Sequence, residues 1–264
     1  MLGETTSRRG ILRPDAARRH YRLTRYPPSA DLAHLVERHW VVEWDLRAPF
    51  TQELVTHPLV NLVFEPHVAL VHGVITGRGA KTIEGRGKAV AVKFRPGGFH
   101  PFLPVPAHTL TDTAVRLRDA FGSDPHAEVL AAGSDRAQIA VVERWLRSLA
   151  PAPDPAVAEI AAIFRRILAD PSLTRVDDLA AATDRTPRAL QRLFREYVGV
   201  KPKWVIERIR LHEAAERMAE GESNWPGLAI DLGYFDQAHF IKAFKAVVGR
   251  SPGDYALTAS AAVG

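Results

Sequence analysis

The feature that most constrains this chain is a proline-rich break, PAPDP at residues 151–155, between a strand-like half and a helical half. From residue 27 to residue 113, apolar residues fall in short runs rich in Val, Phe and Trp, separated by turns with Gly and Pro, which predicts strands. From residue 119 onward, apolar residues recur at helical spacing. Three prolines within five residues stop a helix, so the break predicts a short, stiff linker between domains.

The strand-like half predicts an antiparallel sheet or barrel, because helical segments that could connect parallel strands are missing between most of the runs. We therefore predict an α+β chain, in which an antiparallel β-rich domain is followed by an all-α domain. The predicted parts are a basic N-terminal arm over residues 1–26, the β-rich domain over 27–150, which ends in helices, the linker over 151–155, the all-α domain over 156–257 and a C-terminal tail over 258–264.

Composition excludes several classes of protein. Of 264 residues, 25% are charged and 46% are apolar, as in ordinary globular proteins. The chain has no Cys, which excludes disulfides, thiolate zinc sites and a cysteine nucleophile. No apolar run approaches the ~18 residues of a membrane-spanning helix, and the first residues lack the apolar stretch of a secretory signal. We therefore expect a cytoplasmic protein without a membrane partner.

The positive charge is placed unevenly. The formal net charge is +5, and residues 1–30 hold seven Arg against two acidic residues, whereas residues 155–264 hold 15 basic against 14 acidic residues. A basic leader of this kind is typical of a solvated arm, with contact to DNA phosphates as the alternative. If the helical half binds nucleic acid, it must do so through locally grouped cations.

The helical half repeats one pattern twice. The stretches DLAAATDRTPRALQRLF and LAIDLGYFDQAHFIKAF each read as a helix, a tight turn and a second, amphipathic helix of about three turns. Such a unit can place its second helix in a major groove ~12 Å wide. The predicted helices cover residues 135–150, 156–169, 176–182, 186–198, 201–220, 225–232 and 236–248.

The second helix of each unit has a polar face. In the first unit, four long donors fall at i, i+3, i+4 and i+7 and so share one face, namely Arg188, Gln191, Arg192 and Arg195. Arg can bridge two acceptors of guanine and Gln can bridge adenine, so this face predicts base contacts; an exposed Arg-rich surface is the alternative. The second unit has fewer donors, and we expect it to position the protein on DNA more than to specify the sequence. Its outward residues are Gln237, Ala238, His239, Ile241, Lys242 and Lys245.

The stretch LAAATDRTPRALQRLFREYVGVKPKWVIERIRL and the later GYFDQAHFIKAFKAVVGRSPGDY resemble the DNA-binding domain of the AraC/XylS family of transcription regulators, over about residues 156–255. The resemblance implies two helix-turn-helix units joined by a long linker helix over residues 201–220. By position it also implies base reading by Arg188, Gln191 and Arg192 in the first unit, and by Gln237, Ala238, His239, Ile241 and Lys242 in the second.

Three places depart from the family pattern. Tyr234 replaces a usual Phe, Lys242 replaces a usual Arg and so loses a bidentate fork, and Trp225-Pro226-Gly227 is an unusual start for a supporting helix. Two recognition helices held by one linker helix can enter successive major grooves of double-stranded DNA, ~34 Å apart. The residues expected to contact phosphates are Arg195, Lys201, Lys203, Lys245 and Arg250.

The β-rich half resembles, more loosely, the N-terminal domains of one subgroup of these regulators, on HPLVNLVFEP, GVITG and VKFRPGGFHPFL. That resemblance implies a regulatory or dimerising role and names no effector. Aromatic side chains in this half supply enough surface to line an apolar pocket for a small-molecule effector; the alternative is that they form the core of the domain. The candidates are Trp40, Trp44, Phe64, Phe94 and Phe99.

Metal and phosphate motifs are missing from the sequence. The stretch GRGAKTIEGRG lacks the GK[ST] of a phosphate loop and predicts a hairpin with Gly-containing turns. The scattered histidines form no HxH or HxxxH pair, and we predict no metal, cofactor or catalytic residue. These histidines are His39, His57, His67, His72 and His100.

The leading hypothesis is a sequence-specific DNA-binding transcription regulator, not an enzyme, which would contact RNA polymerase if it is an activator and could form a homodimer. One alternative is a cupin-like or DNA-repair enzyme fused to a DNA-binding domain. Alkyl-transfer repair needs a cysteine acceptor, which the chain lacks. Cupin chemistry needs clustered metal ligands, which the spacing of the residues does not show. The other alternative is a ligand-binding or scaffolding protein whose helical half binds protein rather than DNA.

Overall fold

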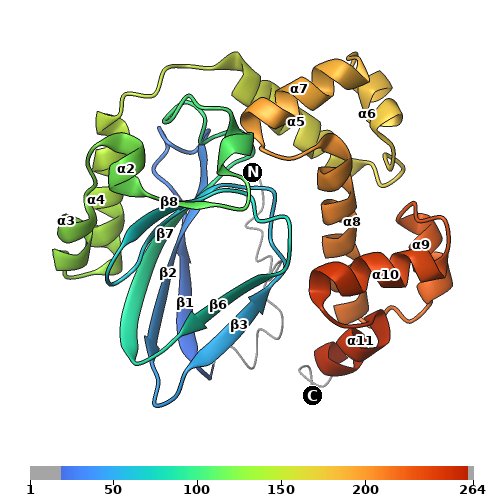
Figure 1. The fold of residues 1–264 in the computed structure, drawn as a ribbon, viewed down its shortest axis with the longest axis horizontal. Coiled ribbons are helices and arrows are strands. Elements are labelled where there is room, and N and C mark those ends of the chain that lie inside the picture. Colours follow the sequence, from blue (N-terminus) through green and yellow to red (C-terminus); the bar gives the residue numbers. More distant parts are fainter. Residues whose placement is uncertain (1–18, 261–264) are drawn as a thin grey trace.

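A β-rich half and a helical half make up the molecule (Figure 1). The structure is a computed structural model, and it describes residues 19–260. Most of the predicted arm and the last four residues of the predicted tail lie outside the described residues. The α+β class predicted from the sequence is confirmed, with the antiparallel sheet before the helices.

Antiparallel strands build the N-terminal half. One sheet has the strand order β1-β2-β7-β4-β5-β8, and β3 pairs with β6 in a separate ribbon. Successive side chains of a strand point to opposite faces, so the large sheet turns one face to a helical core and the other toward the ribbon. The strands are β1 (Tyr21–Tyr26), β2 (Val36–Asp45), β3 (Phe50–Leu54), β4 (Asn61–Phe64), β5 (Ala69–His72), β6 (Gly79–Ile83), β7 (Arg86–Phe94) and β8 (Ala114–Arg116).

Two features of this half differ from the prediction. Strand β1 pairs with β2 along its whole length, so the β-rich domain begins inside the predicted arm of residues 1–26. The hairpin predicted for GRGAKTIEGRG is wrong: Gly85, with φ at +57°, turns the chain between β6 and β7, but these strands pair in different sheets. A turn sets where the chain reverses, whereas pairing depends on strands elsewhere in the sequence.

A helical layer covers one face of the large sheet. Helix α4 (Asp135–Ser148) begins at Ser134, whose hydroxyl accepts a hydrogen bond from the amide of Ala137 at 3.3 Å. Its residues Val142 and Leu146 are fully buried in one core with the inward side chains of the sheet. The preceding elements are the 3-10 helix η1 (Ala107–Leu110), α2 (Leu117–Phe121) and α3 (His126–Ala131).

The helices after the break begin and end within one residue of their predicted bounds. Pro155 is the first residue of α5, and the carboxylate of Asp154 accepts a hydrogen bond from the amide of Ala156 at 2.9 Å, so the linker is one residue shorter than predicted. Helix α11 was not predicted and takes part of the predicted tail. The helices are α5 (Pro155–Ala169), α6 (Val176–Ala182), α7 (Pro187–Tyr197), α8 (Pro202–Ala219), α9 (Trp225–Asp231), α10 (Gln237–Val248) and α11 (Pro252–Ser260).

Helix α8 joins the two cores of the helical half. Val205 and Ile209, near its start, pack with α5, α6 and α7, whereas Leu211 and Met218, nearer its end, pack with α9 and α10. A helix of 18 residues is about 27 Å long. Because both cores include its side chains, α8 sets the spacing between the two helix-turn-helix units (Figure 1).

The start of α7 offers a stability test. The hydroxyl of Thr186 accepts a hydrogen bond from the amide of Ala189 at 3.2 Å and caps the helix. We expect Thr186→Ala to lower the free energy of unfolding by about 1 kcal/mol, because the amide loses its acceptor. Urea unfolding measures the change, and Thr186→Ser, which keeps a hydroxyl cap, is the matched control. Equal stability of the two variants would contradict the capping role.

Candidate nucleic-acid interface

Helix α7 has an apolar face toward the core and a polar face toward solvent. Leu190 and Phe194 are fully buried. Arg188, Gln191 and Arg192 lie on the exposed face. In the part of the chain that the structure describes, no hydrogen bond or ion pair engages these three side chains, so their donors are available to another molecule. The structure thus brings together the three residues predicted to read bases in the first unit.

Helix α10 presents a weaker polar face. Its cap is Asp236, whose carboxylate accepts a hydrogen bond from the amide of His239 at 2.7 Å, and Phe240 and Phe244 are fully buried beneath it. Of the predicted base readers, Ala238, His239 and Lys242 are exposed, while Gln237 and Ile241 are half-buried. Fewer long donors reach solvent here than on α7.

The unusual start of α9 has a local explanation. The side-chain oxygen of Asn224 accepts a hydrogen bond from the amide of Gly227 at 3.1 Å and caps the helix. A Cβ at Gly227 would stand 2.4 Å from the Asn224 side-chain nitrogen, so this cap needs glycine. Pro226 falls in the first turn, where its missing N–H costs nothing. The sequence Trp225-Pro226-Gly227 therefore starts the supporting helix without disturbing the unit.

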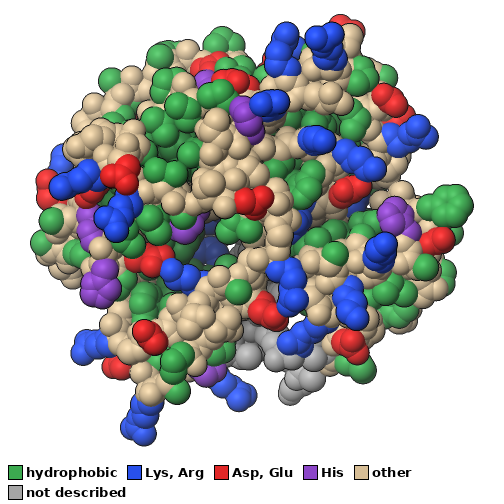
Figure 2. Space-filling view, viewed as in Figure 1, with side chains coloured by type: hydrophobic (Ala, Val, Ile, Leu, Met, Phe, Trp, Pro, Cys, Tyr) green, Lys and Arg blue, Asp and Glu red, His purple; other side chains and the backbone are tan. Residues whose placement is uncertain are grey.

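The predicted phosphate contacts divide into two groups. Lys201, Lys203 and Lys245 are exposed, and Lys203 lies 3.7 Å from Glu207 on its own helix. Arg195 and Arg250 instead contact the β-rich half, as described below. Figure 2 shows Lys and Arg side chains over the visible face of the helical half, on both groups of helices.

The sequence reasoning missed several residues of this half. Phe235, in the turn before α10, is 92% exposed, which is unusual for so large an apolar side chain. Arg208, Arg210 and His212 are buried, although a long helix usually turns such residues to water. Their spacing in the sequence could have revealed them, because these three residues stand among the apolar residues of α8. This helix has no clearly separate polar side to which they would be assigned.

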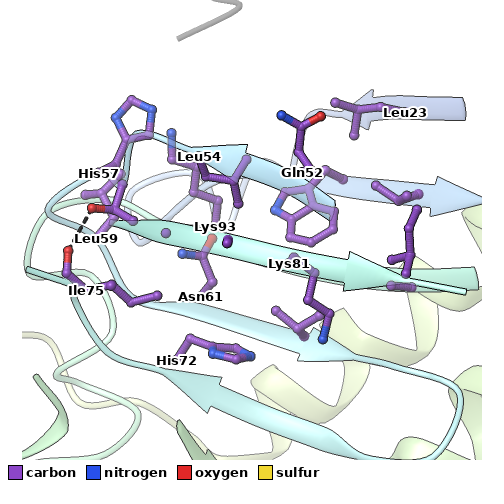
Figure 3. A pocket seen from close by; sticks show the side chains of 18 of the residues that line it. Leu23, Gln52, Leu54, His57, Leu59, Asn61, His72, Ile75, Lys81 and Lys93 are labelled. Atoms are coloured by element: carbon purple, nitrogen blue, oxygen red, sulfur yellow. Dashed lines mark hydrogen bonds between the residues drawn. The ribbon is translucent and has the colours of Figure 1, made fainter. Parts of the chain in front are cut away.

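The β-rich half contains a cavity of about 370 Å³ between the large sheet and the β3–β6 ribbon. Figure 3 shows Lys93, Asn61 and His72 on its sheet side and Leu54 on the ribbon. Trp40 and Trp44 line the cavity, as the prediction of an apolar pocket requires. The same prediction is wrong for three residues, which are buried in the helical core on the opposite face of the sheet; they are Phe64, Phe94 and Phe99.

The histidines do not form a metal site in the described chain. His39 is buried and its Nε2 lies 3.0 Å from Glu143 Oε1, while burial lowers the pKa of the imidazole against the opposing effect of Glu143. Across residues 19–260, no group of three or more His, Asp or Glu side chains is placed to hold a metal ion. Within the same residues, no helix is long and apolar enough to cross a bilayer.

Comparison with known proteins matches both halves separately. Residues 179–257 match a family model described as a helix-turn-helix domain. A segment of 115 residues is 34% identical to a protein of Streptomyces antibioticus named as an AraC-like transcription regulator, covering 43% of this chain and 36% of that protein. A segment of 83 residues is 35% identical to the HTH-type transcriptional activator AarP of Providencia stuartii, covering 31% of this chain and 62% of AarP. The helical half is an AraC-type helix-turn-helix domain.

These matches of the helical half confirm its resemblance to AraC/XylS family regulators. Residues 24–116 match a separate model, a domain of unknown function (DUF6597). The 115-residue alignment covers about a third of the Streptomyces relative, so the similarity concerns the AraC-type domain rather than the whole of that protein. The crystal structure of ToxT from Vibrio cholerae is similar at 10% identity, over 90% of this chain and 98% of ToxT, with a TM-score of 0.40.

The AraC-type domain packs against the β-rich half through α8. The guanidinium of Arg208 donates to the Thr56 hydroxyl at 3.2 Å and to the Thr76 carbonyl at 2.8 Å. His212 Nε2 lies 3.2 Å from the Thr56 carbonyl oxygen, and its ring stacks on His57 with centroids 4.2 Å apart. Burial lowers the pKa of Arg208 to about 10, which leaves it charged at neutral pH. Thr56 and His57 also line the cavity, so one loop contacts both the cavity and α8.

Further contacts engage both ends of the AraC-type domain. Arg195 of α7 donates to His108 Nε2, at 3.2 Å from its Nε and 2.9 Å from its Nη2. Near the other end, Arg250 Nη2 lies 3.7 Å from a carboxylate oxygen of Glu53. Two of the five residues predicted to contact phosphates are therefore held by the β-rich half in this arrangement.

Proposed function

We propose that this chain is a sequence-specific transcription regulator, without catalytic activity, whose α7 and α10 enter successive major grooves of double-stranded DNA. The observation that carries the proposal is the exposed face of α7, where Arg188, Gln191 and Arg192 offer unpaired donors above a buried apolar face. Arg and Gln are the side chains that pair bidentately with guanine and adenine. α8, which belongs to both cores, keeps the two helices at a fixed spacing.

The test is selection of binding sites from random double-stranded DNA, followed by footprinting on the enriched sequence. We expect an asymmetric site with two protected major-groove segments about one helical turn apart, because the two units differ in sequence. Enrichment of no sequence, or footprints confined to one groove, would contradict the two-helix arrangement.

We further propose that the β-rich half controls DNA binding by restraining the AraC-type domain. Arg195 donates to His108, and Arg250 forms an ion pair with Glu53 at 3.7 Å, so opening of these contacts would free both cations for DNA phosphates. The loop that holds Thr56 and His57 connects the cavity to α8, which supports control by a small molecule.

Release of these two cations gives a measurable salt effect. We expect the double variant His108→Ala, Glu53→Gln to bind non-specific DNA more tightly, because each freed Arg can displace a counterion. The slope of log K against log salt should steepen by up to about 0.9 per cation, or about 1.8 in total. Gel shifts at several salt concentrations measure it.

The matched control is Glu65→Gln, which removes a carboxylate from the same half but one that pairs with Lys81, at 2.6 Å, rather than with the AraC-type domain. This control should keep the parent slope. An unchanged slope in the double variant would show that Arg195 and Arg250 do not contact phosphates.

A further inference from the structure

A polar row crosses the large sheet at one end of the cavity. Arg38 of β2 is in register with Lys93 of β7, Lys93 with Asn61 of β4, and Asn61 with His72 of β5. All four side chains line the cavity. Burial lowers the pKa of His72, which favours its neutral form. One end of the cavity therefore presents two cations, an amide and a neutral imidazole side by side.

The next rows of the same face are apolar. Trp40 is in register with Ala91, and Ala91 with Val63; Val42 is in register with Ala89. Ala89 lines the cavity and is small, so it leaves space between larger neighbours, whereas Ala91 is buried in a cluster with Val63 and Ala89. The cavity thus changes along the strands from a polar end to an apolar body bordered by a tryptophan ring.

The cations at the polar end outnumber the carboxylates. Glu37 is the shared partner: its Oε1 lies 3.0 Å from Arg38 Nε and 3.2 Å from Lys93 Nζ. Arg25 also lines the cavity, and no ion pair engages it among the described residues. Lys81 and Glu65, which pair with each other, also line the cavity and act on His72. Four cations therefore face two carboxylates, an excess of two positive charges. The side chains of Arg38 and Lys93 are each only 15% exposed, so water screens this excess poorly.

The pKa values of Lys93 and Glu37 reflect this excess of positive charge. Burial lowers the pKa of Lys93, and the nearby charges of Arg38 and Arg25 lower it further against the opposing effect of Glu37. Burial acts to raise the pKa of Glu37, but Lys93 and Arg38 hold it below its ordinary value. The carboxylate is thus kept charged by its neighbours, and a second anion at this end would stabilise the protonated form of Lys93.

We propose that the cavity binds an organic anion with a flat apolar body, its anionic group against Arg38 and Lys93 and its body over Ala89 and Val63 beside Trp40. Only the role of this ligand as an effector rests on the proposed function; the binding itself does not. The polar end adjoins the loops that precede Asn61 and follow His72, and these loops contain Thr56 and Thr76, the partners of Arg208. The anionic group therefore sits next to the contact between the two halves.

The test compares two probes of the same shape and different charge, 2-naphthoate and 2-naphthamide, by isothermal titration calorimetry on the full chain without DNA. We expect the carboxylate to bind at least about tenfold more tightly, as for a hydrogen bond to a buried charged group. Equal affinity for the two probes, or no binding of either at millimolar concentration, would overturn the proposal.

Variants assign the effect to named residues. Lys93→Met should remove most of the preference for 2-naphthoate, whereas Glu37→Gln should strengthen binding of 2-naphthoate because it removes the competing carboxylate. A change that merely damaged the cavity would weaken both probes alike. Lys81→Met is the matched control, since Lys81 also lines the cavity but is half exposed and paired with Glu65, and it should keep the preference. Loss of the preference in Lys81→Met but not in Lys93→Met would contradict the proposed orientation.

The two proposals fail separately. If 2-naphthoate binds and no DNA sequence is selected, the cavity proposal stands and the regulator proposal does not. If a DNA sequence is selected and neither probe binds, the reverse holds.

Discussion

Replacement of Arg192 by alanine is expected to weaken binding to the selected DNA site by about 1–3 kcal/mol, or about 5- to 150-fold, and to leave non-specific binding nearly unchanged. Arg192 is exposed on α7, on the same face as Arg188 and Gln191, and no described residue pairs with its guanidinium. A bidentate contact to guanine is lost with the side chain, whereas the phosphate contacts that support non-specific binding come from other residues.

The measurement is the ratio of specific to non-specific dissociation constants at two salt concentrations. Arg165→Ala is the matched control, because Arg165 is an exposed arginine of the same domain on α5, outside both helix-turn-helix units. It should leave the ratio at the parent value. An equal loss of specific and non-specific affinity in Arg192→Ala would show that Arg192 contacts phosphate rather than a base.

Replacement of Arg210 by methionine is expected to destabilise the helical half by about 2–4 kcal/mol, because two backbone carbonyls lose a charged donor. Arg210 is 1% exposed, and its guanidinium donates to the carbonyl of Ile167 at 3.0 Å and to that of Asp170 at 2.7 Å, at the end of α5. It also lies 3.1 Å from Glu213. Methionine fills a similar volume but donates no hydrogen bond, so buried carbonyls and a carboxylate lose their partner.

Urea unfolding and amide hydrogen exchange at the end of α5 measure this change. The exchange readout is local, which matters because the chain has two domains and need not unfold in one step. Arg165→Met is the surface control here and should stay within about 0.5 kcal/mol of the parent. A similarly small change for Arg210→Met would mean that water or a rearranged neighbour replaces the guanidinium.

Helix boundaries in the second half could be predicted because their causes are local. Thr186 and Asp236 cap α7 and α10 through hydrogen bonds to amides three residues later. Gly249, with φ at +84°, ends α10 in a conformation that favours glycine. Each signal acts within one turn of helix, so the printed sequence contains all the information needed.

The N-terminal half was predicted less well because its contacts are distant in sequence. The short strands β3 and β6 have few apolar residues and form by pairing with each other across separations of 25 to 33 residues. Phe64 and Phe94 were predicted to line a pocket, but side-chain alternation turns them to the helical core. Strand register decides which of two faces a residue joins, and a single sequence gives no direct measure of register.

The sequence by itself determined the α+β order of the halves, the two helix-turn-helix units and the three donors that share one face of α7. These depend on spacing along one helix and on capping, which involve neighbours in the chain. Only the tertiary structure decided that Arg38, Lys93, Asn61 and His72 form one row, and that Arg208 joins the AraC-type domain to the loops beside the cavity. The physical reason is that these arrangements arise from pairing and packing between residues 11 to 152 positions apart, where the energy depends on the whole fold rather than on local preference.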